Sequence, residues 1–264
     1  MFHDEKLEKI AELLQLQPYW KSIALAQTLG ISKSTVQRCL HELHNSGIAE
    51  RIHGGIRRKD HASQKPLSLN DRLSKDIRAK ECIAIAAIEL MPQNGCIYLD
   101  AGTTTLPLAH AIAKKTNPKL EVVTNDVAIT LALARQNIPH IILSGCMHPV
   151  TQSLSGPVSQ SQIMDFNFQI CFISADGIDS RGNVTGPLVN EAMLKRAAIR
   201  NSEKKVLLAA SSKWNNRSNI LITKFRNFDI WITDKASAAM KSLCRSNNVK
   251  LIVAGQSLTK KKEG

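Results

Sequence analysis

Seven short apolar runs recur through the last two thirds of the chain, and they constrain its fold more than any other feature. Segments with helical periodicity lie between them, near residues 105–115, 126–136, 157–165, 188–202 and 237–246. Continuous apolar strands that alternate with helices predict a mainly parallel sheet covered on both faces. Such a sheet binds ligands at the carboxyl ends of its strands. The runs are Cys96–Leu99, Leu120–Val123, His140–Leu143, Ile170–Ile173, Val206–Leu208, Ile230–Ile232 and Leu251–Val253.

The most specific motif follows the first apolar run, where residues 99–105 read Leu-Asp-Ala-Gly-Thr-Thr-Thr between a predicted strand and a predicted helix. Gly102 would let the backbone come close to a ligand. The amides and hydroxyls of Thr103, Thr104 and Thr105 would then bind a phosphate monoester at the helix N-terminus. Simple capping of the helix by the threonines explains the motif equally well. Because the motif is neither G-x-G-x-x-G nor a P-loop, nucleoside triphosphates are not indicated.

Polar residues follow other predicted strands as well. Each group could be an ordinary turn. Their common position at strand ends nevertheless predicts that they meet in one site. Lys195 lies in the middle of a predicted helix and could reach a phosphate there; the alternative is a solvated lysine that pairs with Glu191, one turn earlier. The polar strand-end groups are Thr124–Asp126, Ser144–Gly145, Asp176–Asp179 and Ser211–Lys213.

The first sixty residues have a different pattern, typical of a winged helix-turn-helix domain. Helical periodicity covers residues 4–16 and resumes in a short second helix that ends at Gly30. Ser32 can cap a third helix, which ends at Gly47. Two short helices joined by a tight turn with a glycine form a helix-turn-helix motif. The glycine pair at 54–55 predicts a β-hairpin directly after the third helix.

Polar residues of the third helix and the hairpin are predicted to contact DNA. On the helix, Arg38 would bind guanine and Gln37 adenine in the major groove. The hairpin would form a wing whose arginines reach phosphates or the minor groove. A generic three-helix packing unit with a polar surface is the alternative. The predicted DNA-binding residues are Lys21, Ser32, Lys33, Ser34, Thr35, Gln37, Arg38, His41, Arg51, His53, Gly54, Gly55, Arg57 and Arg58.

The charge distribution supports a polyanionic partner. The net charge is +13, and residues 51–80, which begin in the predicted wing, contain nine basic and three acidic side chains. The polar stretch after the wing, residues 59–66, reads as a linker, and helical periodicity resumes over residues 69–91. We therefore predict four parts: a DNA-binding domain at 1–58, a linker at 59–80, an α/β effector-binding and oligomerisation domain at 81–258, and a basic tail at 259–264.

Several classes of protein are excluded. The six cysteines form no C-x-x-C pair and no zinc-ligand spacing, so neither a disulfide scaffold nor a metal site is expected. No apolar run approaches the roughly 20 residues needed to span a membrane. The first residues lack the apolar core of a secretory signal. We expect a cytoplasmic protein with no metal, no cofactor and no membrane partner.

Motifs in both halves of the chain together carry a family resemblance. In the N-terminal half they are Leu29–Ser32, Thr35–Leu40, Leu43, Gly47 and Arg51–Gly55. In the C-terminal half they are Leu99–Thr105, Val123–Asn125, Asp176–Asp179, Gly182, Lys195–Arg196 and Ser211–Lys213. With these motifs in this order, the chain resembles the DeoR family of transcriptional regulators over nearly its whole length.

The resemblance implies a function and a set of binding residues. It implies a non-enzymatic repressor of a sugar or polyol catabolic operon, released from operator DNA by a phosphorylated sugar. It also implies an effector domain related in fold to ribose-5-phosphate isomerase, and assembly into dimers or tetramers. Gly102, Thr103, Thr104 and Thr105 would hold the phosphate. The sugar site would be lined by Asp100, Thr124, Asn125, Asp176, Lys195 and Lys213.

Three positions depart from the family pattern. The third helix reads Gln37-Arg38-Cys39-Leu40 where the family usually has arginine-arginine-aspartate-leucine, so operator preference or affinity should change. A glycine pair of the family is Gly145-Cys146 here. Ala210 replaces an aspartate three residues before Lys213, which leaves this lysine or a sugar hydroxyl without an acidic partner.

Two further functions remain as alternatives. A sugar-phosphate isomerase or hydrolase with an appended domain would need a general base, for which Asp176 and Asp179 are candidates. Gly177 and Leu194 stand where related isomerases would carry acids, which disfavours this alternative. A constitutive DNA-binding protein with a decayed effector pocket is the other, and Ala210 is the residue that supports it.

Overall fold

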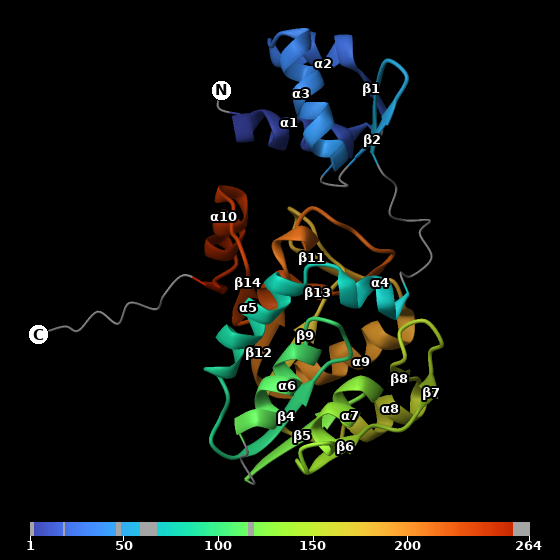
Figure 1. The fold of residues 1–264 in the computed structure, drawn as a ribbon, viewed down its shortest axis with the longest axis vertical. Coiled ribbons are helices and arrows are strands. Elements are labelled where there is room, and N and C mark those ends of the chain that lie inside the picture. The colour runs from blue at the N-terminus through green and yellow to red at the C-terminus, as the bar shows by residue number, and fades with distance from the viewer. Residues whose placement is uncertain (1–2, 18, 46–48, 59–67, 116–118, 256–264) are drawn as a thin grey trace, which may run out of the picture. The chain divides into compact units, whose positions relative to one another are not determined.

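The fold was analysed in a computed structural model of the chain, which describes residues 3–17, 19–45, 49–58, 68–115 and 119–255. The chain divides into two compact units, Met1–Ser63 and Gln64–Gly264 (Figure 1). Each unit has its own apolar core. The predicted tail at 259–264 lies outside the described residues, as does the first part of the predicted linker.

The first unit is a helical domain with a small antiparallel sheet. Its core contains Ile10, Leu14, Leu25, Leu40 and Ile56, all of them almost completely buried. The helix-turn-helix consists of the second and third helices, and Gly30 ends the second helix in the left-handed conformation, with φ 63°. The elements are α1 (His3–Leu16), β1 (Tyr19–Lys21), α2 (Ser22–Leu29), α3 (Lys33–Asn45), β2 (Ala49–Ile52) and β3 (Gly55–Arg58).

The predicted hairpin, β2 and β3, is part of a three-stranded sheet in the order β1-β3-β2. The sequence did not predict the edge strand β1. The two glycines at the turn of the hairpin have different roles. Gly54 has φ 77°, which the turn requires. At Gly55, a Cβ atom would lie 2.2 Å from the backbone oxygen of Trp20 on β1. The second glycine is therefore needed because β1 packs so closely against β3.

The second unit is built on a seven-stranded parallel sheet in the order β15-β14-β12-β9-β4-β5-β6. Every one of the seven predicted apolar runs forms a strand of this sheet, so the predicted fold class is confirmed. The chain starts in the middle at β4, runs outward to β6, and returns to β9 on the other side of β4. The strands are β4 (Gly95–Leu99), β5 (Leu120–Thr124), β6 (His140–Ile142), β9 (Phe168–Ser174), β12 (Ser202–Leu208), β14 (Ile230–Thr233) and β15 (Lys250–Val253).

Helices cover both faces of the sheet, as the continuous apolar strands predicted. Alternate strand residues point to opposite faces: Ile97 and Leu99 pack with α5, α6 and α7, whereas Tyr98 packs in the core that contains α9 and α10. None of the helices in the described part of the chain is long and apolar enough to cross a membrane. The helices are α5 (Ile77–Ile88), α6 (Leu106–Lys115), α7 (Val127–Ala134), α8 (Pro157–Ile163), α9 (Val189–Arg200) and α10 (Ala238–Ser246).

The sequence did not predict several short elements. Two small antiparallel sheets lie beside the main one. Their strands are two to five residues long and leave no distinct apolar run, so the sequence pattern did not indicate them. Helix α4 (Leu69–Ser74) and the start of α5 lie within the segment assigned as a linker at 59–80, where the helical periodicity from residue 69 had indicated a helix. The added strands are β7 (Cys146–Met147), β8 (Leu154–Ser155), β10 (Gly177–Ile178), β11 (Asn183–Gly186) and β13 (Ile220–Lys224); η2 (Ser211–Lys213) and η3 (Phe225–Asn227) are 3-10 helices.

Candidate functional site

The surface predicted to contact DNA is formed by the outer face of α3. Val36, Cys39, Leu40 and Leu43 bury the other face of this helix in the core. At its N-terminus, the Ser32 hydroxyl accepts a hydrogen bond from the Thr35 amide at 3.2 Å, as an N-cap does. Of the side chains on α3 that are predicted to contact DNA, those of Lys33, Ser34, Arg38 and His41 are exposed.

Gln37, which was predicted to bind a base, makes hydrogen bonds within the protein. Its side-chain oxygen accepts a hydrogen bond from Arg51 at 2.7 Å, and its amide nitrogen lies 3.3 Å from the Ser22 hydroxyl. These contacts tie the wing to α3. Arg57 pairs with Glu50 at 2.7 Å, an exposed contact that stabilises little. Lys21, His53 and Gly54 are exposed and Gly55 is buried, whereas the side chain of Arg58 lies outside the described part of the chain.

The predicted effector site lies where the order of the parallel strands reverses. Strands β4 and β9 are neighbours in the sheet, but the chain leaves them toward opposite edges. Ligands bind at such switch points, outside the carboxyl ends of the strands. Asp100 follows β4, and Ser174 ends β9. The hydroxyl and the amide of Ser174 both donate to Asp100 Oδ2, at 2.7 Å and 2.9 Å.

Lys195 completes this buried contact and is not available to a ligand. Its ammonium group lies 2.5 Å from Asp100 Oδ2 and donates to the Ser174 carbonyl at 2.9 Å. The lysine and the aspartate are both almost completely buried. Burial raises the pKa of Asp100, against the attraction of Lys195. The group therefore braces the loop between β4 and α6. These contacts match neither the prediction that Asp100 and Lys195 bind the effector nor the alternative of a solvated helix lysine.

The loop itself uses many of its donors internally. The Gly102 amide donates to Asp126 at 3.1 Å. The Thr105 hydroxyl donates to the carbonyls of Asp100 and Gly102 at 2.7 Å and 2.8 Å. A Cβ atom on Gly102 would lie 2.6 Å from the Ser174 hydroxyl, so the close approach that requires glycine is to Ser174. Contacts within the protein therefore explain both Thr105, whose hydroxyl donates to loop carbonyls, and Gly102.

Two further predicted residues have the same internal role. The Thr124 hydroxyl donates to the Leu99 carbonyl at 2.7 Å. Asn125 accepts from the Tyr98 hydroxyl at 2.8 Å and donates to the Leu154 carbonyl at 2.9 Å. These side chains join the ends of β4 and β5, which explains their position at strand ends without a ligand.

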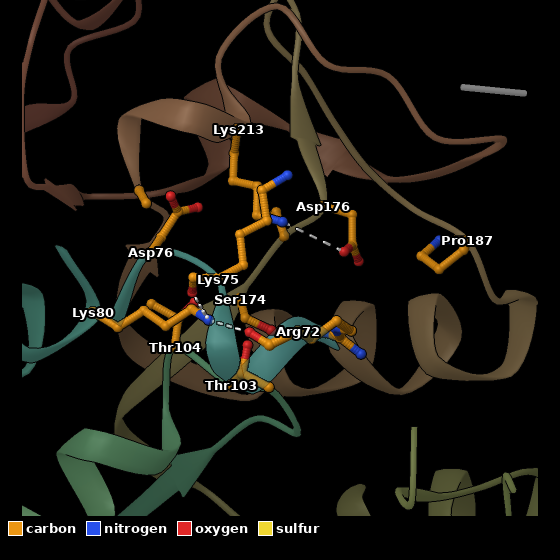
Figure 2. Close-up of a pocket in the computed structure, with 12 residues that line it drawn as sticks. Arg72, Lys75, Asp76, Lys80, Thr103, Thr104, Ser174, Asp176, Pro187 and Lys213 are labelled. Atoms are coloured by element: carbon orange, nitrogen blue, oxygen red, sulfur yellow. Dashed lines mark hydrogen bonds and ion pairs between the residues drawn. The ribbon is translucent and has the colours of Figure 1, made fainter. Parts of the chain in front are cut away.

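A pocket opens next to the braced loop (Figure 2). In this view, Lys213 enters from above, and Thr103 and Thr104 lie below. Of the predicted effector residues, Thr103, Thr104, Asp176 and Lys213 line it. The complete lining is Arg72, Lys75, Asp76, Lys80, Thr103, Thr104, Ser174, Ala175, Asp176, Pro187, Ala210 and Lys213.

Thr103 and Thr104 present unused donors to this pocket. Each is only 6% exposed, yet neither hydroxyl has a hydrogen-bond partner within the described part of the chain. Both precede the N-terminus of α6, where the helix dipole favours an anion. Both hydroxyls are therefore free to donate to an oxyanion bound in the pocket.

Positive charge predominates around the pocket. Four cationic side chains face two carboxylates there. Burial and the neighbouring charges of Lys213, Arg72 and Lys75 lower the pKa of Lys80 to about 8, although Asp76 opposes them. Burial also lowers the pKa of Lys213. Because these cations repel one another, an anion bound among them would be favoured.

Lys213 has an acidic partner despite the departure at Ala210. The carboxylate of Asp176 lies 3.8 Å from its ammonium group, so the prediction that this lysine lacks such a partner is wrong. Although burial opposes it, the charges of Arg72, Lys213 and Lys195 lower the pKa of Asp176. Ala210 lines the pocket itself, where it leaves room that an aspartate would fill.

Sequence reasoning missed Arg72, Lys75 and Lys80, because they fall in the segment predicted to be a linker. The excess of basic residues at 51–80 was the one signal that could have indicated them. That excess was attributed to DNA, whereas three of its members line a pocket in the second unit. In the described ranges, no group of three or more His, Cys, Asp or Glu side chains could hold a metal ion.

Comparison with known families gives two matches that together span most of the chain. The sequence model described as "DeoR C terminal sensor domain" matches residues 75–235. The one described as "DeoR-like helix-turn-helix domain" matches residues 6–62. The sensor match begins at Lys75, inside the segment predicted to be a linker.

Individual proteins are similar over most of their length. A lactose phosphotransferase system repressor of Streptococcus mutans is 31% identical over 216 residues, covering 81% of this chain and 84% of the relative. The transcriptional regulator GlpR of Haloferax volcanii is 28% identical, covering 89% and 91%. A putative aga operon transcriptional repressor of Escherichia coli O157:H7 is 28% identical, covering 96% and 94%.

Solved structures are more distant. Ribose 5 phosphate isomerase A from Neisseria gonorrhoeae is 20% identical, with a TM-score of 0.39, and covers 51% of this chain and 52% of the other. The isomerase from Methanocaldococcus jannaschii is 14% identical, with a TM-score of 0.41 and coverages of 53% and 55%. At these scores the similarity supports no functional argument.

Proposed function

Because the chain belongs to the DeoR family of transcriptional regulators, we propose that it represses a sugar or polyol catabolic operon and leaves DNA when a phosphorylated sugar binds. The names of two relatives support the repressor role, since both are described as repressors, one of a lactose phosphotransferase system and one of the aga operon. The helix-turn-helix domain supplies DNA binding.

One observation carries the assignment of the effector: the pocket combines unpartnered threonine hydroxyls with clustered cations. Thr103 and Thr104 would donate to phosphate oxygens from the N-terminus of α6, and Lys213 would add a charge-assisted bond. Asp176 at the far side would accept from sugar hydroxyls. A phosphate monoester with an attached polyol fits this arrangement of donors and one acceptor.

The same contacts favour a sensor over an enzyme. Isomerisation needs a general base that is free to take a proton from carbon. Asp176 is paired with Lys213, and its lowered pKa makes it a weak base. Asp179 accepts from the amides of Arg181 and Asn183 at 3.0 Å and 2.8 Å, so it shapes a turn. A sensor requires only that the ligand bind one state better than the other.

On the DNA side, we assign base reading to Arg38 and phosphate contact to the wing. Both remain predictions, as do the roles of Lys33, Ser34 and His41 beside them. A single helix-turn-helix contacts only a few base pairs, so we expect an oligomer on repeated half-sites. Replacing Arg38 with alanine should cost about 1–3 kcal/mol on the preferred sequence and relax selection at one base.

The test is a titration of the full-length protein with triose, pentose and hexose monophosphates, followed by DNA-binding assays. The DNA would be an operator selected from a random-sequence library. The tightest monophosphate should lower DNA affinity by about 1–3 kcal/mol of coupling free energy. Lys213→Gln should weaken monophosphate binding about tenfold, because one charge-assisted bond is lost. Lys241→Gln, on the exposed surface of α10, is the control and should change nothing.

Two results would contradict this function. If no monophosphate binds the wild-type protein, the pocket is not a sugar-phosphate sensor. If the tightest binder leaves DNA affinity unchanged, binding is not coupled to regulation, and a constitutive DNA-binding protein is the better description. Turnover of any monophosphate during the titration would instead favour an enzyme.

A further inference from the structure

Helix α4 is the part of the pocket wall that is held least firmly. None of its six residues, Leu69–Ser74, is buried. Its C-terminal end is held by Lys80, whose ammonium group donates to the carbonyls of Arg72 and Lys75, the latter at 2.6 Å. The residue after this end, Asp76, accepts from the Ser212 hydroxyl at 2.6 Å. The helix is therefore attached by polar contacts that surround the pocket.

Cations at the C-terminal end of α4 face other cations across the pocket. Arg72 and Lys75 line the same space as Lys80 and Lys213 (Figure 2). Burial is the largest cause of the lowered pKa of Lys80, and the charges of Lys213, Arg72 and Lys75 add to it. Without an anion, the repulsion among these cations opposes the attraction of Arg72 to Asp176. A dianionic phosphate between them would reverse the sign of that interaction.

The position of α4 in the chain could couple phosphate binding to the DNA-binding unit. The helix follows directly after the segment that joins the DNA-binding unit to the sensor unit. A change in how firmly α4 is held therefore acts on that connection before it reaches any other element. No other wall of the pocket has this place in the sequence: the threonines belong to the β4–α6 loop, and Lys213 belongs to η2.

On the premise that the pocket binds a sugar phosphate, we propose that α4 transmits the signal: Arg72 and Lys75 bind the phosphate, and this clamps α4 onto the sensor core. The bound anion favours the clamped state over the loose one, which is a shift between two populations. The clamped helix then fixes Ser68, the point at which the chain reaches the sensor core from the DNA-binding side. Arg72 and Lys75 thus act both as effector ligands and as the start of the connection to DNA.

The first test measures amide hydrogen exchange in residues 68–76 of the full-length protein, with inorganic phosphate or with chloride at equal ionic strength. Phosphate should slow exchange in this segment. Arg72→Gln and Lys75→Gln should each remove the protection and weaken phosphate binding about tenfold. Arg78→Gln is the matched control, because Arg78 is exposed on α5 and does not line the pocket. Unchanged exchange in the wild-type segment under saturating phosphate would overturn the proposal.

The second test separates binding from transmission. A Gly-Ser-Gly insertion between Pro66 and Leu67 lengthens the connection without altering the pocket residues. The variant should bind the tightest sugar monophosphate and the selected operator separately as wild type does, but the monophosphate should no longer release the operator. Release at the wild-type concentration would contradict transmission through α4.

The outcomes distinguish this inference from the function on which it rests. If no monophosphate binds wild type, both fail. If monophosphates bind and release DNA, while Arg72→Gln behaves as Arg78→Gln does, the sensor function stands and the role of α4 is refuted.

Discussion

The two walls of the pocket are built in opposite ways. The loop between β4 and α6 is braced from below by the Asp100–Ser174–Lys195 contact, whose members are almost completely buried. The opposite wall, from Arg72 to Lys80, includes a helix with no fully buried residue and brings three cations into the pocket beside Asp76. One wall is fixed by buried contacts, whereas the other is attached by polar contacts at its C-terminal end.

The two walls would contribute differently to a sensor, one to its affinity and the other to its response. A preorganised wall gives affinity, because its donors need no rearrangement when the phosphate arrives. A loosely held wall gives response, because a ligand can shift only an equilibrium that is already close to balance. The comparison predicts that substitutions in the loop wall change stability, and that substitutions in the α4 wall change the response to phosphate with little effect on stability.

The largest effect is expected at the base of the braced wall. Lys195→Ala should lower the free energy of unfolding by about 3–5 kcal/mol, because it leaves the buried charge of Asp100 without a partner. Urea denaturation of the full-length protein would measure this, with Lys241→Ala as an exposed-lysine control. The double variant D100N/K195M should recover much of the loss, since it removes both charges. A loss below about 1 kcal/mol for Lys195→Ala would place this pair among ordinary surface contacts.

A smaller loss of stability is expected at Gly102, which packs closely against Ser174. Gly102→Ala should cost about 1–3 kcal/mol, because the added Cβ must displace the Ser174 hydroxyl. The backbone at Gly102 does not have a positive φ, so the cost is one of packing. In a double-mutant cycle with Ser174→Ala, the two penalties should be less than additive, since the second change removes the clashing oxygen. Full additivity, or a Gly102→Ala variant that only loses its response to phosphate, would show that the loop faces a ligand at this point.

The sequence predicted the main sheet and the helices that cover it, and the reason is physical. Strands buried on both faces are apolar throughout, so a run such as Ile170–Ile173 is visible without knowledge of its neighbours. The short antiparallel strands are not, because Asn183–Gly186 becomes a strand only through its pairing with β10 and β13. Local pattern identifies the elements that form one continuous core and misses those fixed by tertiary pairing.

The sequence predicted that polar residues at strand ends lie close together, but not which of their side chains line the pocket. Strand-end residues do converge, as the topology requires, yet Gly102, Thr105, Thr124 and Asn125 are used inside the protein. A sequence cannot show which hydrogen bonds are already satisfied. It also could not show that the segment around Arg72 lies against the pocket, because the helical periodicity that begins at residue 69 indicates a helix but not the contacts of its polar side chains.

The α4 wall should respond far less than the braced wall. In the absence of phosphate, the double variant R72Q/K75Q should change the free energy of unfolding by less than about 0.5 kcal/mol, because the lost repulsion from Lys80 is offset by the lost attraction to Asp176. Added inorganic phosphate should raise the melting temperature of wild type and of R78Q, but not of the double variant. A marked destabilisation by R72Q/K75Q would mean that α4 is part of the permanent core, and the contrast between the walls would be lost.

The smallest effect concerns pH, and it isolates one charge of the α4 wall. The pKa of Lys80 lies at about 8, and its neighbours are Lys213, Arg72, Lys75 and Asp76. A bound phosphate raises this pKa, so binding takes up a proton above pH 8, and affinity must fall as pH rises past that value, by at most about tenfold per pH unit for one group. Calorimetric titration with inorganic phosphate between about pH 7 and pH 9 should give a decrease of about three- to tenfold. Lys80→Arg keeps its charge throughout this range and should flatten the profile. An equally steep profile for Lys80→Arg would assign the titration to Lys213, whose pKa is also lowered, and would remove Lys80 from the effector site.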